Sequence, residues 1–256
     1  MRKYRIFILF LLMGVIPGCS IKEERDGCPC RLFLDMTSVD AADQAPFTIS
    51  VFSEEGFVCN TVLESDEFVD TCVFEVPRSV LDVVVWSGGG KFLDDEGLSI
   101  PLGDECPPVF IHQGRLDAKG EAVYDQVRLH KNYCILSVNF VDDHMVKRLV
   151  LRGSVSGFDK VGNPVPGDFY VQAQSDPVTS GRFYIPRNSG YPSYLDVMEL
   201  DGVTRTFPLH DYMSEYGYES DGKDLCDLNM SLEYTPVGIT LTIQGWDEEI
   251  VLNIAI

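Results

Sequence analysis

Apolar and polar residues alternate along most of the chain after residue 30, and this alternation restricts the possible fold more than any other feature. Within residues 133–141, for example, most of the apolar side chains share one face, while Ser137 and Asn139 lie on the other. Successive side chains of a β-strand point to opposite faces of its sheet, so a period of two is typical of a half-buried strand. The pattern predicts an all-β protein with little helix.

Turn signals divide the alternating segments into many short strands. Glycine, proline, asparagine and aspartate cluster at 162–164, 166–168, 188–190 and 201–202, where the sequence predicts chain reversals. The expected strands are 31–36, 47–52, 68–76, 80–86 and 122–129, followed by 133–141, 149–151, 169–173, 182–185, 194–200, 228–234, 239–243 and 250–256. Many short strands separated by turns favour two β-sandwich domains, which we place at 28–130 and 131–256.

One segment has the spacing of a helix. In residues 208–216, Leu209, Tyr212, Met213 and Tyr216 recur at intervals of three and four, so they fall on one helical face. We expect a short helix that covers one end of the second pair of sheets.

The first 18 residues predict a lipoprotein signal peptide that ends before Cys19. Arg2, Lys3 and Arg5 precede an apolar run at 6–13, and 14–19 resembles a lipobox with a small residue directly before Cys19. We expect Cys19 to carry acyl chains and residues 19–27 to form a charged tether. Two alternatives are a transmembrane anchor, for which the apolar run is short, and cleavage by ordinary signal peptidase.

The strongly acidic composition limits the partners of this chain. Its formal net charge is −20, and loss of the three basic residues in the signal segment leaves 17 basic against 40 acidic residues. Such a surface repels phosphate backbones and anionic lipid headgroups, so we exclude nucleic acid as a partner. Membrane contact should therefore come through lipid on Cys19.

Seven cysteines remain in the predicted mature chain besides Cys19: Cys28, Cys30, Cys59, Cys72, Cys106, Cys134 and Cys226. An odd number cannot pair completely within one chain. Cys28-Pro29-Cys30 has no second short Cys or His pair to complete a zinc site, so structural disulfides or buried thiols are the favoured interpretations.

A search for catalytic motifs finds none that is complete, and we predict that the protein is not an enzyme and needs no cofactor or metal. Residues 153–157 resemble a nucleophile elbow, but Val155 stands where the nucleophile belongs. The triplet 142–144, Asp-Asp-His, and the acidic stretch 94–97 are interpreted as turns and not as metal sites. The glycine run 87–90 lacks the lysine and helix start of a phosphate loop.

Carbohydrate binding is the alternative function, because aromatic faces stack on sugar rings. The candidate aromatic residues are Trp86, Trp246, Tyr184, Tyr191, Tyr194, Tyr212, Tyr216 and Tyr218. Trp86 ends an almost wholly apolar segment and the tyrosines alternate with core positions, so packing accounts for most of them.

Several segments together resemble the FimB-type fimbrial anchor lipoprotein family of Bacteroidales. Residues 19–29 resemble the family's opening, in which a lipid cysteine precedes an acidic tether and a Cys-Pro pair. The other similar segments are 84–88, 109–114, 127–132, 157–164, 209–213 and 243–246. This chain departs from the pattern in Cys30, which follows the Cys-Pro pair, and in Pro17 of the lipobox.

The resemblance implies two tandem transthyretin-like β-sandwiches and a surface lipoprotein that ties a fimbrium to the outer membrane through lipid on Cys19. Fimbrial subunits are the implied partners, and no small-molecule substrate is expected. Such a role needs an edge or groove where another subunit's strand can pair. Segment 249–256 has Ile250, Leu252, Ile254 and Ile256 on one face, which suits insertion into a partner's sandwich and equally suits completion of its own sheet.

Overall fold

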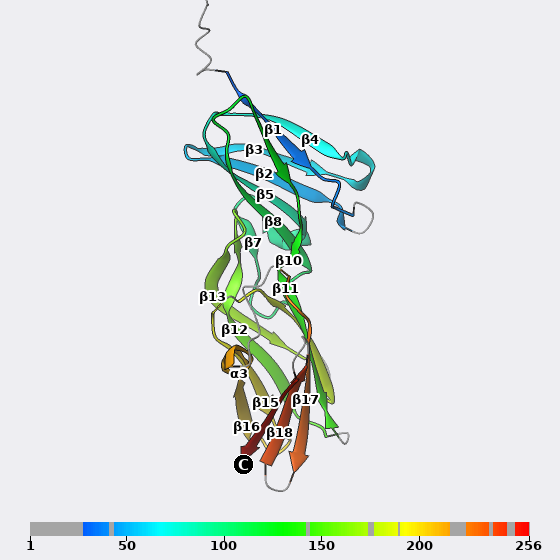
Figure 1. The fold of residues 1–256 in the computed structure, drawn as a ribbon. Coiled ribbons are helices and arrows are strands. Elements are labelled where there is room, and N and C mark those ends of the chain that lie inside the picture. The colour runs from blue at the N-terminus through cyan, green and yellow to red at the C-terminus, as the bar shows by residue number, and fades with distance from the viewer. Residues whose placement is uncertain are drawn as a thin grey trace, which may run out of the picture.

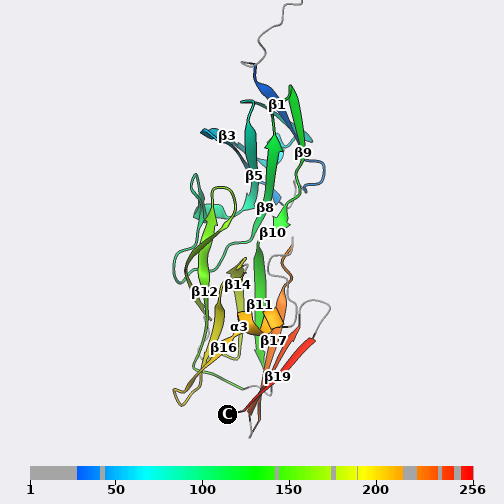
Figure 2. The ribbon, with the colours of Figure 1, turned by 60° about the vertical axis from the view of Figure 1, so that its left-hand side comes forward.

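The computed structural model describes residues 28–40, 44–141, 144–173, 177–188, 190–215, 224–235, 238–244 and 249–255. Within them the chain forms an elongated molecule of two β-sandwiches placed end to end (Figure 1). Residue 28 lies at one end and the last strand reaches the opposite end, and a rotated view shows the same separation (Figure 2). The all-β fold expected from the alternation is confirmed.

The first sandwich packs a three-stranded sheet on a five-stranded sheet. The smaller sheet has the order β4 (Thr71–Val76), β1 (Cys30–Asp35) and β9 (Ala122–Gln126). The larger has the order β10 (His130–Lys131), β8 (Val109–Asp117), β5 (Val80–Gly88), β2 (Phe47–Ser53) and β3 (Gly56–Leu63). Two short 3₁₀ turns, η2 (Ser65–Glu67) and η3 (Gly90–Phe92), lie in the connections.

The central strand β5 is buried on both faces, which explains its nearly continuous apolar sequence. Val83 and Val85 belong to the core between the two sheets of the first sandwich. Val84 and Trp86 point the other way and join the core cluster that contains the second sandwich. A strand covered on both sides has no polar face, so the period of two disappears there.

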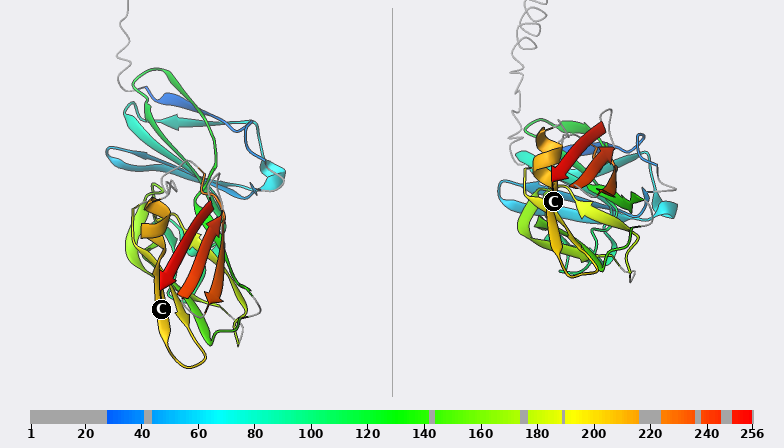
Figure 3. Two further views of the ribbon diagram at one scale, coloured as in Figure 1. Left: turned by 60° about the horizontal axis from the view of Figure 1, so that its bottom comes forward. Right: turned by 90° about the horizontal axis from the view of Figure 1, so that it is seen from below.

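The second sandwich also has two sheets. One has the order β14 (Ser180–Pro186), β11 (Tyr133–Phe140), β17 (Leu228–Thr235), β18 (Gly238–Gln244) and β19 (Glu249–Ala255). The other has the order β16 (Thr204–Pro208), β15 (Ser193–Met198), β12 (Arg148–Asp159), β7 (Gly97–Ser99) and β6 (Leu93–Asp94), with β13 (Pro164–Gln172) paired to β12. Figure 3 shows β18 and β19 side by side at the rim of this sandwich.

The two sandwiches repeat one strand arrangement, which the sequence does not reveal. The neighbours β4-β1-β9 recur as β14-β11-β17, with an antiparallel pair on one side and a parallel pair on the other. The run β8-β5-β2-β3 recurs as the antiparallel run β16-β15-β12-β13. The hairpin β18–β19 has no counterpart in the first sandwich. It adds two strands beside β17, whereas the corresponding strand β9 is the edge of its sheet.

The junction between the sandwiches is made by strand pairing as well as by apolar packing. Strand β7 pairs antiparallel with the end of β12, where Leu98 lies opposite Phe158. The Nε2 of Gln113 on β8 donates a hydrogen bond to the Val161 carbonyl in the β12–β13 turn, at 2.5 Å. Residues 93–99 thus lie in a sheet of the second sandwich although they precede residue 130. The boundary at 130/131 itself stays a prediction, as does the transthyretin-like topology.

Helix α3 (Leu209–Glu215) confirms the predicted helix, and its Leu209 and Met213 side chains are buried against the second sandwich. No helix in the described part of the chain is long and apolar enough to cross a membrane.

The predicted turn at 166–168 is wrong, because Pro166, Gly167 and Asp168 lie inside β13. Strand β13 pairs on one side only, and an edge strand tolerates proline because its outward N–H needs no partner in the sheet.

Candidate functional site: an open sheet edge

The predicted lipidation site, Cys19, lies outside the described residues, and so does the tether at 20–27. The described chain enters at Cys28 and passes directly into β1, the central strand of the three-stranded sheet. A lipid at Cys19 would therefore be attached to the end of the molecule that is farthest from β19 (Figure 1).

Strand β19 is a long and regular edge. It pairs antiparallel with β18 over seven residue pairs, from Gly238 opposite Ala255 to Gln244 opposite Glu249, without a register shift. Its other side has no partner strand among the described residues. Glu249 is its only charged residue, and it contains no proline. A flat, apolar edge strand of this kind is a template for pairing with another chain.

The side chains of β19 alternate between a core-facing and an exposed face, as the sequence predicts. Leu252 and Ile254 are partly buried against the core of the second sandwich, while Val251 is 51% exposed on the other face. Asn253 accepts a hydrogen bond from the Thr240 hydroxyl at 3.0 Å. In this structure the last strand completes its own sheet, which was one of the two uses expected for it. The side chain of Ile250 and residue 256 lie outside what the structure describes.

The other edges of the second sandwich are protected against pairing. The segment between β7 and β8 crosses the edges of β13 and β14, where the Gly103 N–H donates to the Tyr170 carbonyl at 2.9 Å and the Cys106 N–H to the Tyr184 carbonyl at 3.1 Å. Strand β13 also contains Pro164 and Pro166 and two register shifts. Strand β16 is five residues long and ends in proline. These devices are ones that proteins use against unwanted strand addition.

The edges of the first sandwich are shorter or interrupted. Strand β3 has a register shift opposite Val51 and Phe52, which bends it locally. Strand β9 turns a charged side chain, Asp125, toward the interior, where it meets His112. Strand β4 is a regular edge of six residues. Within the described residues, β19 is the longest uncovered edge whose pairing has no register shift.

The buried pair of His112 and Asp125 has a structural arrangement. His112 is 7% exposed, and its Nδ1 accepts the Arg128 N–H at 3.1 Å, so this nitrogen carries no proton. Its Nε2 then donates to the Asp125 carboxylate at 2.9 Å. Both ring nitrogens are occupied in holding β9 against β8.

A second histidine cluster ties the two sheets of the second sandwich together. The His144 ring stacks on the Tyr234 ring with centroids 3.9 Å apart, and its Nε2 lies 3.1 Å from Glu199. Burial raises the pKa of the Tyr234 hydroxyl, and the neighbouring Glu199 carboxylate raises it further. Asp142 and Asp143 of the predicted turn lie outside the described residues. No group of three or more His, Cys, Asp or Glu side chains within the described ranges is arranged to hold a metal.

The cysteines are spread over both sandwiches. Cys28, Cys30, Cys59, Cys72 and Cys106 carry free thiols. Burial raises the pKa of the Cys106 thiol, which lies deep in the larger core cluster. Buried thiols were one of the two interpretations that the sequence left open, and it holds for Cys30, Cys72 and Cys106, whereas Cys28 is exposed and Cys59 half-buried.

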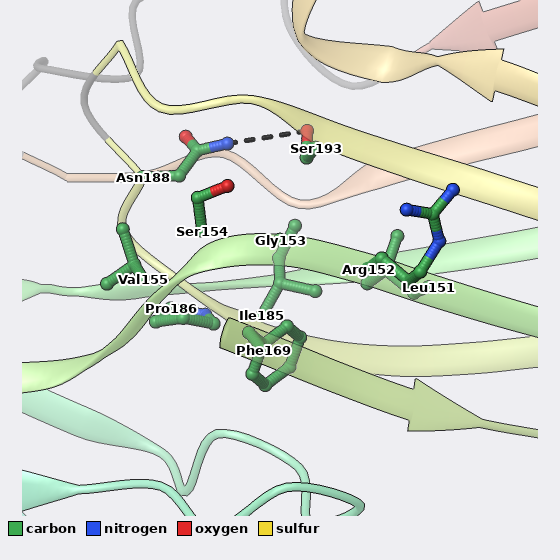
Figure 4. A pocket seen from close by; sticks show the side chains of 10 residues that line it. All are labelled: Leu151, Arg152, Gly153, Ser154, Val155, Phe169, Ile185, Pro186, Asn188 and Ser193. Atoms are coloured by element: carbon green, nitrogen blue, oxygen red, sulfur yellow. Dashed lines mark hydrogen bonds between the residues drawn. The ribbon is translucent and has the colours of Figure 1, made fainter. Parts of the chain in front are cut away.

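The elbow-like segment 153–157 lies in the extended strand β12, so its backbone has no sharp turn. Beside it is a small pocket of about 10 Å³, lined by Gly153, Phe169 and Ile185 among others (Figure 4). That volume is about the space of one water molecule and holds no organic substrate.

The predicted aromatic candidates do not form one cluster. Trp86 is 2% exposed and belongs to the core. Tyr184, Tyr191, Tyr194 and Tyr212 are half-buried on different elements. Trp246, Tyr216 and Tyr218 lie outside the described residues.

The most exposed aromatic side chain among the described residues was not among the predicted candidates. Tyr124 on β9 is 72% exposed and stacks on Phe33 of β1 with ring centroids 4.8 Å apart. The sequence signal is the alternation in β9, which places this tyrosine on the face away from the core.

No protein-family profile matches the chain, and no curated protein matches it in sequence. Solved structures match its fold. The fimbrial anchor protein Mfa2 from Porphyromonas gingivalis aligns at a TM-score of 0.64 and 11% identity, covering 89% of this chain and 100% of that one.

Two proteins from Bacteroides thetaiotaomicron are similar as well. One is described as a proposed adhesin, with a TM-score of 0.61, 13% identity and coverage of 88% of this chain and 99% of that one. The other is described as a proposed polysaccharide-binding protein, with a TM-score of 0.58, 14% identity and coverage of 88% and 98%. The resemblance to fimbrial anchor proteins of Bacteroidales is thus confirmed for the fold.

Proposed function

We propose that the protein is a lipid-anchored protein of the outer membrane that holds a fimbrium at the cell surface and pairs with a fimbrial subunit through the open edge of β19. The observation that carries the proposal is this edge, which runs for seven residues without a bulge, a proline or an outer partner within the described chain. Backbone hydrogen bonds along such an edge give affinity without any catalytic group.

The positions of the two ends support a role in mechanical attachment. The chain leaves the described structure at residue 28 toward the predicted lipid, and β19 lies at the opposite end of the molecule (Figures 1 and 2). A subunit bound at β19 would therefore extend away from a membrane that holds Cys19. The fold neighbour Mfa2 is described as a fimbrial anchor protein, which also supports the proposal.

The membrane half of the proposal is tested with Cys19→Ala in the native host. We expect the variant protein to appear in the medium, together with fimbriae that electron microscopy counts in the cell-free supernatant. Retention of the variant in the membrane fraction at the wild-type level would contradict lipidation at Cys19.

The pairing half is tested with a charge on the proposed edge. In Val251→Lys the new ammonium lies on the exposed face of β19, and lysine is a residue that natural edges use to prevent strand addition. We expect the variant to stay in the membrane while fimbrial subunits no longer co-purify with it.

Val62→Lys is the matched control. Val62 is 50% exposed on β3, an edge strand of the first sandwich, so the two substitutions place the same charge on equally exposed edge valines. Co-purification of subunits should be unchanged in Val62→Lys. Equal loss in both variants, or no loss in Val251→Lys, would contradict pairing at β19.

A further inference from the structure

A cleft of about 350 Å³ lies on the outer face of the second sandwich, away from β19. Its floor is β12, where Arg152 lies opposite Tyr170 of β13 on one side and opposite Tyr194 of β15 on the other. Directly opposite residues in a sheet project from the same face, so the two tyrosines stand on either side of the arginine. The volume is within the range of small-molecule sites.

Hydrogen bonds orient the Arg152 side chain in this cleft. Its Nε and one Nη donate to both oxygens of Asp196, at 2.5 and 3.0 Å, and the Thr206 hydroxyl donates to the same carboxylate at 2.6 Å. The guanidinium lies 5.2 Å from the centre of the Tyr194 ring. An arginine has five N–H donors, so the remaining ones stay available to a ligand in a fixed direction.

The remaining walls of the cleft supply both polar and apolar groups. Ser154 follows on β12, and Figure 4 shows its hydroxyl and the Arg152 guanidinium on the side of β12 away from Phe169. Asp168 lines the wall on β13, and no cation of the described chain pairs with it. Leu102, which is 66% exposed, covers the edge next to Tyr170.

We propose that this cleft binds a neutral pyranose unit of a carbohydrate. The C–H face of a sugar ring can stack on a tyrosine ring, while its hydroxyls can accept from Arg152 and donate to Asp168. Asp196 already neutralises Arg152, so Asp168 leaves the cleft with a net negative charge, in a protein whose formal charge is −20. This balance disfavours sialylated, uronic-acid and sulfated sugars and selects neutral ones.

The test is a glycan array probed with the full-length protein in detergent, carrying neutral gluco-, manno- and galacto-configured oligosaccharides beside sialylated and uronic-acid oligosaccharides. We expect binding to at least one neutral series. The best glycan is then titrated against Tyr170→Ala and Tyr194→Ala, each of which should weaken binding about tenfold or more. Tyr194→Phe keeps the ring and should bind as the wild type does.

The control variant is Tyr124→Ala, which removes a more exposed tyrosine from the first sandwich. It should leave binding unchanged, and circular dichroism should confirm that all four variants are folded. An array without neutral binders, binding restricted to anionic glycans, or loss of binding in Tyr124→Ala with retention in the two cleft variants would overturn the proposal. None of these results bears on the pairing at β19, which the co-purification experiment tests separately.

Discussion

Gly157 is a position where a single methyl group should displace strand β7 from strand β12. It lies on β12 opposite Ser99 of β7, with φ at +153°. A Cβ at this position would lie 1.9 Å from the Leu98 carbonyl oxygen, and its next contacts are also backbone atoms. Backbone cannot rotate out of the way as a side chain can, so Gly157→Ala must displace β7 from β12.

The loss of stability in Gly157→Ala follows from the contacts that are broken when β7 moves away from β12. The backbone conformation alone is unfavourable for an L-residue by about 1–3 kcal/mol. The pairing of β7 with β12 and the hydrogen bond from the Ile100 N–H to the Ser156 carbonyl at 2.8 Å are weakened as well, at about 1 kcal/mol for each hydrogen bond lost. We expect a decrease of about 3–5 kcal/mol in the free energy of unfolding.

The assay is urea denaturation followed by intrinsic fluorescence and by circular dichroism, with Gly153→Ala as the matched control on the same strand. A Cβ on Gly153 would meet the Phe169 ring at 3.4 Å, an ordinary contact with a side chain that can adjust. Its unfolding free energy should change by about 1 kcal/mol or less. Equal unfolding midpoints for Gly157→Ala and Gly153→Ala would refute the claim that the close pairing of β7 with β12 at Gly157 stabilises the fold.

Three further substitutions test other parts of the structure. The hydrogen bonds from Arg152 lower the pKa of Asp196. At a pH above the ordinary pKa of an aspartate, the ionised carboxylate therefore stabilises the fold, and this contribution is lost as the pH falls through the lowered pKa of Asp196. The stability difference between the wild type and Asp196→Asn should therefore be largest near neutral pH and shrink in acid, as measured by urea midpoints; a constant difference would contradict this. His112→Ala leaves the Asp125 carboxylate without its hydrogen-bond donor, and calorimetry should show destabilisation of about 1–3 kcal/mol; an unchanged Tm would show that the pair contributes nothing. Trp86→Ala removes the indole ring that β5 contributes to the core cluster of the second sandwich. Urea denaturation should show a decrease of about 3–5 kcal/mol in the free energy of unfolding, and a decrease below about 1 kcal/mol would place Trp86 outside the core.

The sequence predicts strands with one apolar face, and it also predicts β5 from its continuous apolar run; it misses strands that have neither pattern. Strand β1 alternates between buried and half-exposed positions, and its predicted range agrees with the structure within a residue or two. Strand β3 has no buried residue and gives no period of two, so it was not predicted. Strand β8 was also missed, because the buried His112 and the following polar and glycine residues interrupt its apolar pattern.

Strand length is predicted poorly where glycine is present. The sequence suggests a strand at 149–151, but β12 runs from Arg148 to Asp159. Gly153 and Gly157 are weak strand formers, and Gly157 is placed where the Leu98 carbonyl approaches closely, which a single sequence does not show. The tertiary contact, and not the local preference, decides the conformation of this segment.

Neither proposed site could be located from the sequence, because each depends on which strands are neighbours. The alternation in β19 shows which side chains face the core, but an edge is defined by the absence of a further strand, which is a property of the whole sheet. In the cleft, Tyr170, Arg152 and Tyr194 come from three strands and meet only because β13 and β15 pair with opposite sides of β12. Of the two tyrosines, Tyr194 is among the candidate aromatic residues and Tyr170 is not, although Tyr170 lies in the predicted strand 169–173. A motif search fails here for a physical reason: the ligand-facing groups are set by strand register, and register is fixed by the packing of the core between the sheets.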